Sequence, residues 1–235
     1  MLLHILTLTL LAGLSMPLGA WLACAERIRP HWLEKEFRHS VIALGGGALL
    51  SAVALVLVPD GLEHLDTTAA LFWFVLGGMI FLCIDVLLNH FKTSASQLVA
   101  MLADFVPESI ALGATFALGG SNGLLLALLI GLQNLPEGFN AFRELRHHTG
   151  YSARRIILIF ALMALMGPAA AWLGYSWLAD YPAVVSSIML FAAGGILYSV
   201  FQDIAPQVKL ERHWGPPMGA VLGFALGIAG HMLTA

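Results

Sequence analysis

Two short stretches of this sequence place acidic and amide side chains around a proline within otherwise apolar segments. The stretch LADFVPESIALGA contains Asp104 and Glu108, and the stretch IGLQNLPEGFNAFREL contains Gln133 and Glu137. Residues four apart lie on the same face of a helix, so each stretch predicts a polar stripe on an apolar helix. Carboxylate and amide oxygens are ligands that suit a hard divalent cation, and the two stripes together therefore indicate a cation site.

The prolines of the two stretches, Pro107 and Pro136, add to this prediction. Proline has no N–H, so the carbonyl four residues earlier loses its helical partner. Such carbonyls are tolerated at membrane depth where they line a cavity, and there they are further oxygen ligands. On two antiparallel helices Glu108 and Glu137 would lie at about the same depth. A cation pathway explains the doubled pattern, and a purely structural polar core is the alternative.

The composition indicates a membrane protein. The 235 residues are 59% hydrophobic and 11% charged, with a mean hydropathy of +0.86, whereas soluble domains have about 25% charged residues. No basic patch indicates nucleic-acid binding. Cys24 and Cys83 have no metal-binding spacing and are interpreted as apolar helix residues. The apolar N-terminus resembles a secretory signal but lacks a positive start, so we expect a retained first helix.

The apolar runs predict an all-α polytopic membrane protein with eight transmembrane helices, forming one domain over residues 1–235. All eleven Lys and Arg residues fall in the loops on one side of this arrangement. The positive-inside rule therefore predicts both termini on the extracytoplasmic side. The predicted spans are residues 3–24, 38–59, 69–90, 96–118, 122–145, 154–176, 183–204 and 215–234.

The order of the spans hints at an internal repeat. Span 2 contains ALGGGALL and ends at Pro59-Asp60, and span 7 contains FAAGGILYSV and ends near Asp203 and Pro206. The two proline motifs occupy spans 4 and 5, which run in opposite directions. This order fits a 3+2+3 inverted repeat, a common arrangement in transporters.

The motifs resemble those of the ZIP (Zrt/Irt-like) family of metal transporters. The segments QNLPEG at 133–138 and DFVPES at 104–109 resemble that family's paired proline-glutamate motifs. Residues 45–65 and 192–206 resemble its second and seventh helices. The resemblance implies a divergent bacterial member that transports zinc, iron, manganese or cadmium between helices 4 and 5, both part of a mobile bundle.

Carried over to this sequence, the family pattern also shows departures. The His and Asn usual in the helix 4 motif are replaced by Asp104 and Phe105, a glutamate of helix 6 by Gly167, and a methionine of helix 2 by Leu49. A second metal position is therefore in doubt, and we expect one metal at a time. The resemblance implies metal ligands at Asp104, Glu108, Gln133 and Glu137, with Asn134 contributing to a second metal position.

Further residues could guide a cation to or from the site. Met101 extends the first stripe, Glu144 and His147 follow the second, Asp203 ends span 7, and His64 lies on the outer loop. For the histidines and Asp203, a solvated helix end or loop is the alternative interpretation.

These observations predict a transporter of divalent transition-metal ions. We expect import into the cytoplasm across the cell (inner) membrane, by alternating access at a midplane site. The metal ion is the substrate, and neither an organic cofactor nor a nucleic acid is implied. The expected surroundings are the lipid bilayer, and the sequence leaves open whether the protein forms a homodimer. Three carboxylates exceed a divalent charge by one, so a proton could bind when the metal leaves. The alternatives are a structural or regulatory subunit with a protonated polar core and an intramembrane metalloenzyme, for which HExxH is absent.

Overall fold

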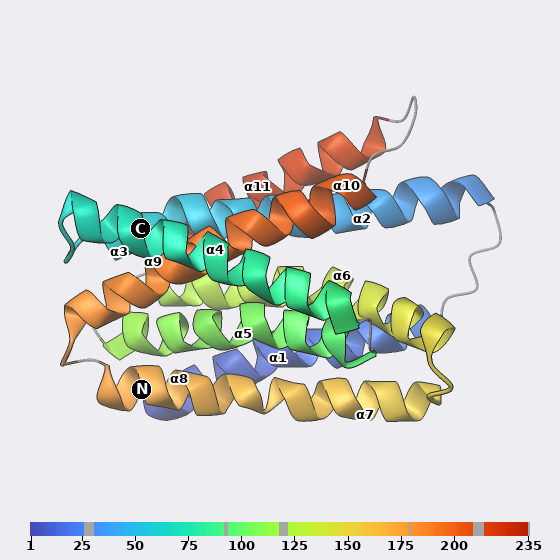
Figure 1. Cartoon of the computed structure of the whole chain (residues 1–235), viewed down its shortest axis with the longest axis horizontal. Helices are drawn as coiled ribbons and strands as arrows, with labels where there is room; N and C mark the ends of the chain where they lie inside the picture. Colours follow the sequence, from blue (N-terminus) through green and yellow to red (C-terminus); the bar gives the residue numbers. More distant parts are fainter. Residues whose placement is uncertain (26–30, 92–93, 118–121, 179, 209–213, 235) are drawn as a thin grey trace.

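The computed structural model describes residues 1–25, 31–91, 94–117, 122–178, 180–208 and 214–234. This part of the chain consists of helices joined by short turns, without strands (Figure 1). The elements are α1 (Leu2–Ala25), α2 (His31–Ala52), η1 (Val53–Leu57), α3 (Val58–Leu62), α4 (Thr67–Phe91), α5 (Ser94–Ala117), α6 (Gly123–His148), α7 (Ala153–Ala164), α8 (Met166–Trp177), α9 (Pro182–Ser199), η2 (Val200–Ile204), α10 (Ala205–Gln207) and α11 (Gly215–Thr234).

The eight predicted spans are confirmed as helical segments, and most ends agree within three residues. The exception is span 2, whose helix begins at His31 instead of residue 38. The prediction of a loop there was wrong, because the sequence LEKEFR consists largely of residues with high helix propensity. Span 6 is interrupted at Leu165, where α7 ends and α8 begins.

Seven of the described helical segments are long and apolar enough to cross a membrane, and α6 is not among them. Helix α6 has 26 residues, which is ample length for a span. Its polar stripe and the charges of its last turns lower its mean hydropathy. Because half of its residues are buried in the protein, including Gln133 and Asn134, α6 does not need the apolar surface that a lipid-facing helix needs.

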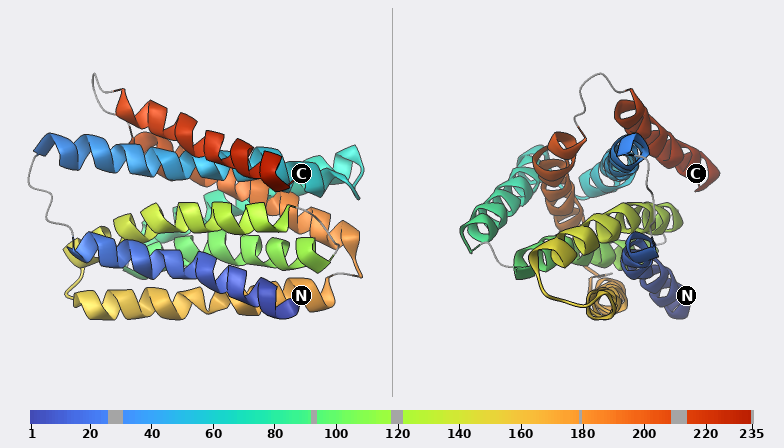
Figure 2. Two further views of the ribbon diagram at one scale, coloured as in Figure 1. Left: turned by 180° about the vertical axis from the view of Figure 1, so that it is seen from behind. Right: turned by 90° about the vertical axis from the view of Figure 1, so that its right-hand side faces the viewer.

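The helices form two groups (Figures 1 and 2). In the first group α1 packs on α6, α7 and α8, and α5 packs on α8 and α6. In the second group α2 packs on α11, and α4 packs on α9. The pair α1·α6 corresponds to α5·α8, and the pair α2·α11 corresponds to α9·α4, as expected when spans 1–3 and 6–8 are inverted repeats of each other. We call these the α6 group and the α2 group. The α2 group includes η1 and α3, which continue α2, and η2 and α10, which continue α9.

Spans 2 and 7 share a further feature, a short π-helical turn. Residues Val53–Leu57 form such a turn before Pro59, and residues Val200–Ile204 form one before Pro206. A proline ring clashes with the carbonyl four residues earlier, and the wider π turn accommodates this position in both helices. The equivalent placement supports the inverted repeat.

Helices α1 and α6 approach very closely at the proline turn of α6. A side chain at Gly138 would overlap the backbone of Met16, and one at Gly19 would overlap the carbonyl of Leu135. Small residues allow such contact between membrane helices, where packing replaces the hydrophobic effect as the force of association. The close contact fixes the backbone of α6 next to Glu137.

The two ends of the bundle differ in charge. The N- and C-termini lie at one end (Figure 2). The arginines of the described residues lie at or near the opposite end, at the start of α2 and α7 and the end of α6. We call this the basic end; the positive-inside rule predicts that it is cytoplasmic.

Candidate metal-transport site

The two polar stripes predicted from the sequence meet between α5 and α6. Glu108 is fully buried, with 0% exposure, and Gln133 is 1% exposed. The Gln133 Nε2 donates to both carboxylate oxygens of Glu108, at 2.7 and 2.6 Å. An isolated buried carboxylate is very unfavourable, so this amide is an important partner for Glu108.

Two amides of α6 lie side by side in the chain but have different partners. Asn134 donates from Nδ2 to the Ala12 carbonyl of α1, at 3.0 Å. Gln133 Oε1 is buried and has no hydrogen-bond partner. An unpaired buried acceptor costs about 1–3 kcal/mol. Asn134 therefore ties α6 to α1, whereas Gln133 keeps one amide oxygen without a hydrogen-bond partner beside Glu108.

The other two predicted carboxylates, Asp104 and Glu137, lie about one helical turn from Glu108 and Gln133 and are partly exposed. Glu137 repels both Glu108 and Asp104 electrostatically, and Asp203 of η2 repels Asp104 and Glu137. Ser199 donates to Asp104 Oδ1 at 3.5 Å, a long hydrogen bond from the α2 group. The accumulated negative charge indicates a site suited to a cation.

Within the described residues, no three His, Cys, Asp or Glu side chains are grouped closely enough to hold a metal ion together. Three carboxylates without a cation repel one another. Metal coordination by all three predicted carboxylates would therefore require them to move closer together than they are here.

Phe105 fills the space beside the site. Its side chain is fully buried, and its ring end would be only 2.9 Å from a Cβ at Gly13 and 2.6 Å from a Cβ at Gly167. The two glycines thus form a cradle for the aromatic ring. The replacement of a polar residue by Phe105 and the glycine at 167, two departures seen in the sequence, fit each other in the structure.

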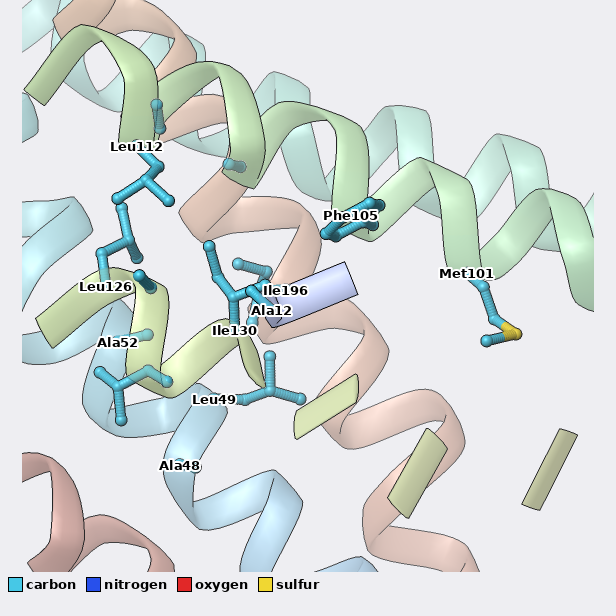
Figure 3. Close-up of a cluster of buried hydrophobic side chains, with 14 of the residues drawn as sticks. Ala12, Ala48, Leu49, Ala52, Met101, Phe105, Leu112, Leu126, Ile130 and Ile196 are labelled. Carbon is cyan, nitrogen blue, oxygen red and sulfur yellow. The ribbon is translucent and has the colours of Figure 1, made fainter. Parts of the chain in front are cut away.

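Apolar side chains close the site on the side of the termini. Ile130 and Leu126 of α6, Leu112 of α5, Leu49 of α2 and Ile196 of α9 are all nearly fully buried and belong to one cluster (Figure 3). The cluster joins the α6 group to the α2 group. A hydrated cation would not pass such a dry, close-packed layer without a rearrangement.

Exposure increases from Glu108 toward the basic end. Glu108 is buried, Asp104 and Glu137 are partly exposed, and Asp203 and Glu144 are exposed. Asp203 also lies within electrostatic range of Glu144. These acidic residues form a series from the buried site to that end of the bundle.

The remaining predicted pathway residues lie away from the buried pair. Met101 is in the apolar core. His147 is exposed at the end of α6 with its ring against that of His148, and His64 is exposed at the opposite end, 3.9 Å from the Glu63 carboxylate. The structure does not bring these residues to Glu108 and Gln133.

Two polar contacts were not predicted from the sequence. Tyr198 donates to Asp85 Oδ2 at 3.0 Å within the α2 group, which gives Asp85 a partner. Asn122, just before α6, donates to Asp60 Oδ1 of α3 at 3.0 Å and links the two groups. Both contacts join residues at least 62 positions apart, so no local pattern could have indicated them.

The fold and the site together define a polytopic helical membrane protein with a buried acidic centre. No protein-family model matches the chain. A protein of Arabidopsis thaliana named as a putative zinc transporter is 27% identical over 234 residues, or 96% of this chain. The chain spans 34% of the length of that relative. The chain is thus similar along nearly its whole length to a protein named as a putative zinc transporter, in agreement with the resemblance of its motifs to those of the ZIP family.

Proposed function

We propose that the protein transports divalent transition-metal ions across the membrane through the site between α5 and α6. The observation that carries this proposal is the contact of the two stripes, in which Gln133 and Glu108 meet in the buried interior with Asp104 and Glu137 beside them. The similarity to a protein named as a putative zinc transporter supports it.

The ligands we propose are the carboxylates of Asp104, Glu108 and Glu137 and the amide oxygen of Gln133. In the present arrangement the amide N–H of Gln133 faces the Glu108 carboxylate, and its oxygen has no partner. Rotation of this amide would bring the oxygen to the carboxylate side, where a cation between them would satisfy both groups. Among transition metals the oxygen-rich ligand set suits manganese best, and carboxylate oxygens also bind zinc and iron.

We propose that the ion moves toward the cytoplasm by alternating access. The apolar cluster around Ile130 closes the side of the termini, whereas the acidic series through Asp203 leads to the basic end. The proposed ligands all belong to α5 and α6, so the α6 group could carry the site as a unit past the α2 group. Asn134, bonded to α1, would hold α6 in that group.

We expect one metal ion per chain at saturation. The Phe105 ring fills the space between Gly13 and Gly167, so this side of the site offers no polar ligand for a second ion. Equilibrium dialysis followed by elemental mass spectrometry measures the ratio. Two ions per chain, both lost in Glu137→Ala, would contradict the single site.

We expect the apparent metal affinity to fall as the pH is lowered from about 8 to about 5. The three proposed carboxylates must be ionised to bind the metal, so protons compete with it. Titration of purified protein with Mn²⁺ or Zn²⁺ at several pH values measures this dependence. Equal affinity across the range would refute the part of the mechanism in which a proton replaces the departing metal.

The test of the proposed function is metal uptake into proteoliposomes with a panel of Zn²⁺, Mn²⁺, Fe²⁺, Cd²⁺ and Mg²⁺. We expect uptake of transition metals in preference to Mg²⁺, because Mg²⁺ demands strict octahedral geometry and sheds water reluctantly. If folded protein takes up none of these ions at any pH or voltage, the Gln133–Glu108 contact is a structural polar core.

A further inference from the structure

A cavity of about 510 Å³ lies between α1, α2 and α6, close to the basic end. Its volume is within the range of ligand-binding pockets, about 300–1,000 Å³. Among the residues that the structure describes, ten line it: eight are apolar, and the two polar ones are Arg38 and Asn140. It lies apart from Glu108 and Gln133, neither of which lines it.

The apolar lining opens at the surface of the bundle. Leu22 of α1 is 41% exposed and Phe37 of α2 is 55% exposed, and both line the cavity. Ile42 of α2 forms part of its interior and is nearly fully buried. Exposed apolar side chains on a membrane-spanning bundle face lipid. The cavity is thus accessible from the bilayer to a hydrocarbon chain.

The two polar residues have buried atoms with no hydrogen-bond partner. Arg38 Nε and Asn140 Oδ1 are both inaccessible to solvent and unpaired in the structure. A guanidinium keeps its charge and is suited to binding phosphate through several N–H groups. A buried, unpaired donor of this kind is costly, and a bound phosphate oxygen would satisfy it.

The charge among the described residues that line the cavity is also positive. Arg38 is the one charged residue in that described lining. Arg143 lies with its guanidinium 5.8 Å from the ring centre of Phe139, another lining residue. Glu36 and Glu144 lie at the same end and, like Arg143, are not among the described residues that line the cavity, so the charge of the described lining is that of Arg38. An anionic ligand is therefore favoured over a neutral or cationic one.

We propose that this cavity binds an anionic phospholipid, with the phosphate at Arg38 and an acyl chain against Leu22, Phe37 and Phe139. Basic pockets between membrane helices on the cytoplasmic side typically bind anionic lipid headgroups. A free phosphate ion would make no use of the eight apolar lining residues. The bound lipid would sit between the α6 group and the α2 group, against Pro136, the neighbour of Glu137.

Native mass spectrometry of the full chain in mild detergent, with added phosphatidylglycerol or phosphatidylcholine, tests this proposal. We expect phosphatidylglycerol to bind more tightly than phosphatidylcholine. Arg38→Gln should weaken phosphatidylglycerol binding about tenfold, as expected for loss of one charge-assisted hydrogen bond. The control is Arg154→Gln, because Arg154 is exposed at the same end of the bundle and does not line the cavity. This variant should bind phosphatidylglycerol as tightly as the original chain.

A second variant keeps the test decisive if Arg38→Gln does not fold. Ala25 lines the cavity and is exposed, so Ala25→Phe should fill the opening and reduce lipid binding with Arg38 intact. Three results would each overturn the proposal. The first is phosphatidylglycerol binding that is unchanged in Ala25→Phe, and the second is a loss of that binding in Arg154→Gln equal to the loss in Arg38→Gln. The third is binding of inorganic phosphate in place of the lipid. The readout is independent of metal transport, so the two proposals can fail separately.

Discussion

Glu137→Ala is expected to reduce metal uptake into proteoliposomes at least about a hundredfold, since even residues that only support metal ligands affect affinity by 10–100-fold. Glu137 is partly exposed beside the buried Glu108–Gln133 pair and repels the Glu108 carboxylate. Alanine removes one of three proposed anionic ligands, and the remaining two would only just neutralise the ion. The uptake assay with Zn²⁺ and Mn²⁺ measures the loss.

Two control variants separate loss of a ligand from loss of the fold. Glu137→Gln keeps the size and one oxygen but not the charge, so it should fold like the original chain and transport at an intermediate or low rate. Asp180→Asn removes an exposed carboxylate at the opposite end of the bundle and should leave uptake within about twofold, since surface charges have small effects. Full uptake by Glu137→Ala would exclude Glu137 as a metal ligand.

The sequence was sufficient to predict the elements and the stripes. Apolar runs of about 20 residues predict spans directly. Asp104 and Glu108 are four residues apart, as are Gln133 and Glu137, and this spacing predicts that each pair shares one helix face. These are local features of single helices. The sequence also predicted that the two stripes belong to one site, but the particular contact of Gln133 with Glu108 was found only in the structure.

The features that the sequence did not reveal depend on packing between distant segments. Phe105 fits against Gly13 and Gly167, three residues of three different helices. The wide turns before Pro59 and Pro206 arise where a proline ring meets a helix that tertiary contacts keep continuous. Neither feature has a pattern within one helix from which it could be predicted.

Cross-linking Asp60→Cys to Asn122→Cys is expected to abolish transport reversibly. These residues form a 3.0 Å hydrogen bond from α3 of the α2 group to the start of α6, at the end of the bundle where the termini lie. If the α6 group must move past the α2 group, a covalent link here will hold it in one position. A short bifunctional methanethiosulfonate reagent would be applied in proteoliposomes, so that it forms one disulfide with each cysteine and releases sulfinate. Uptake would be measured before cross-linking, after it, and again after a thiol reductant has cleaved both disulfides.

The background for this experiment needs replacement of the two native cysteines, Cys24 and Cys83, because both are exposed. The control is the pair Asp85→Cys and Tyr198→Cys, whose parent side chains form a hydrogen bond of the same 3.0 Å length within the α2 group. Linking this pair leaves the two groups free to move, so uptake should not change on cross-linking. For each protein, uptake after cross-linking is compared with uptake of the same protein before the reagent is added. This comparison removes the effect of the substitutions themselves.

The two outcomes distinguish two ways of crossing the membrane. Loss of uptake only in the Asp60–Asn122 pair, with recovery on reduction, would mean that the carboxylate site reaches the two sides in turn as the α6 group moves. Unchanged uptake in that linked pair would mean that the ion passes the apolar cluster around Ile130 while the groups stay together. The protein would then conduct metal as a channel, and the contact between Asn122 and Asp60 would only stabilise the fold.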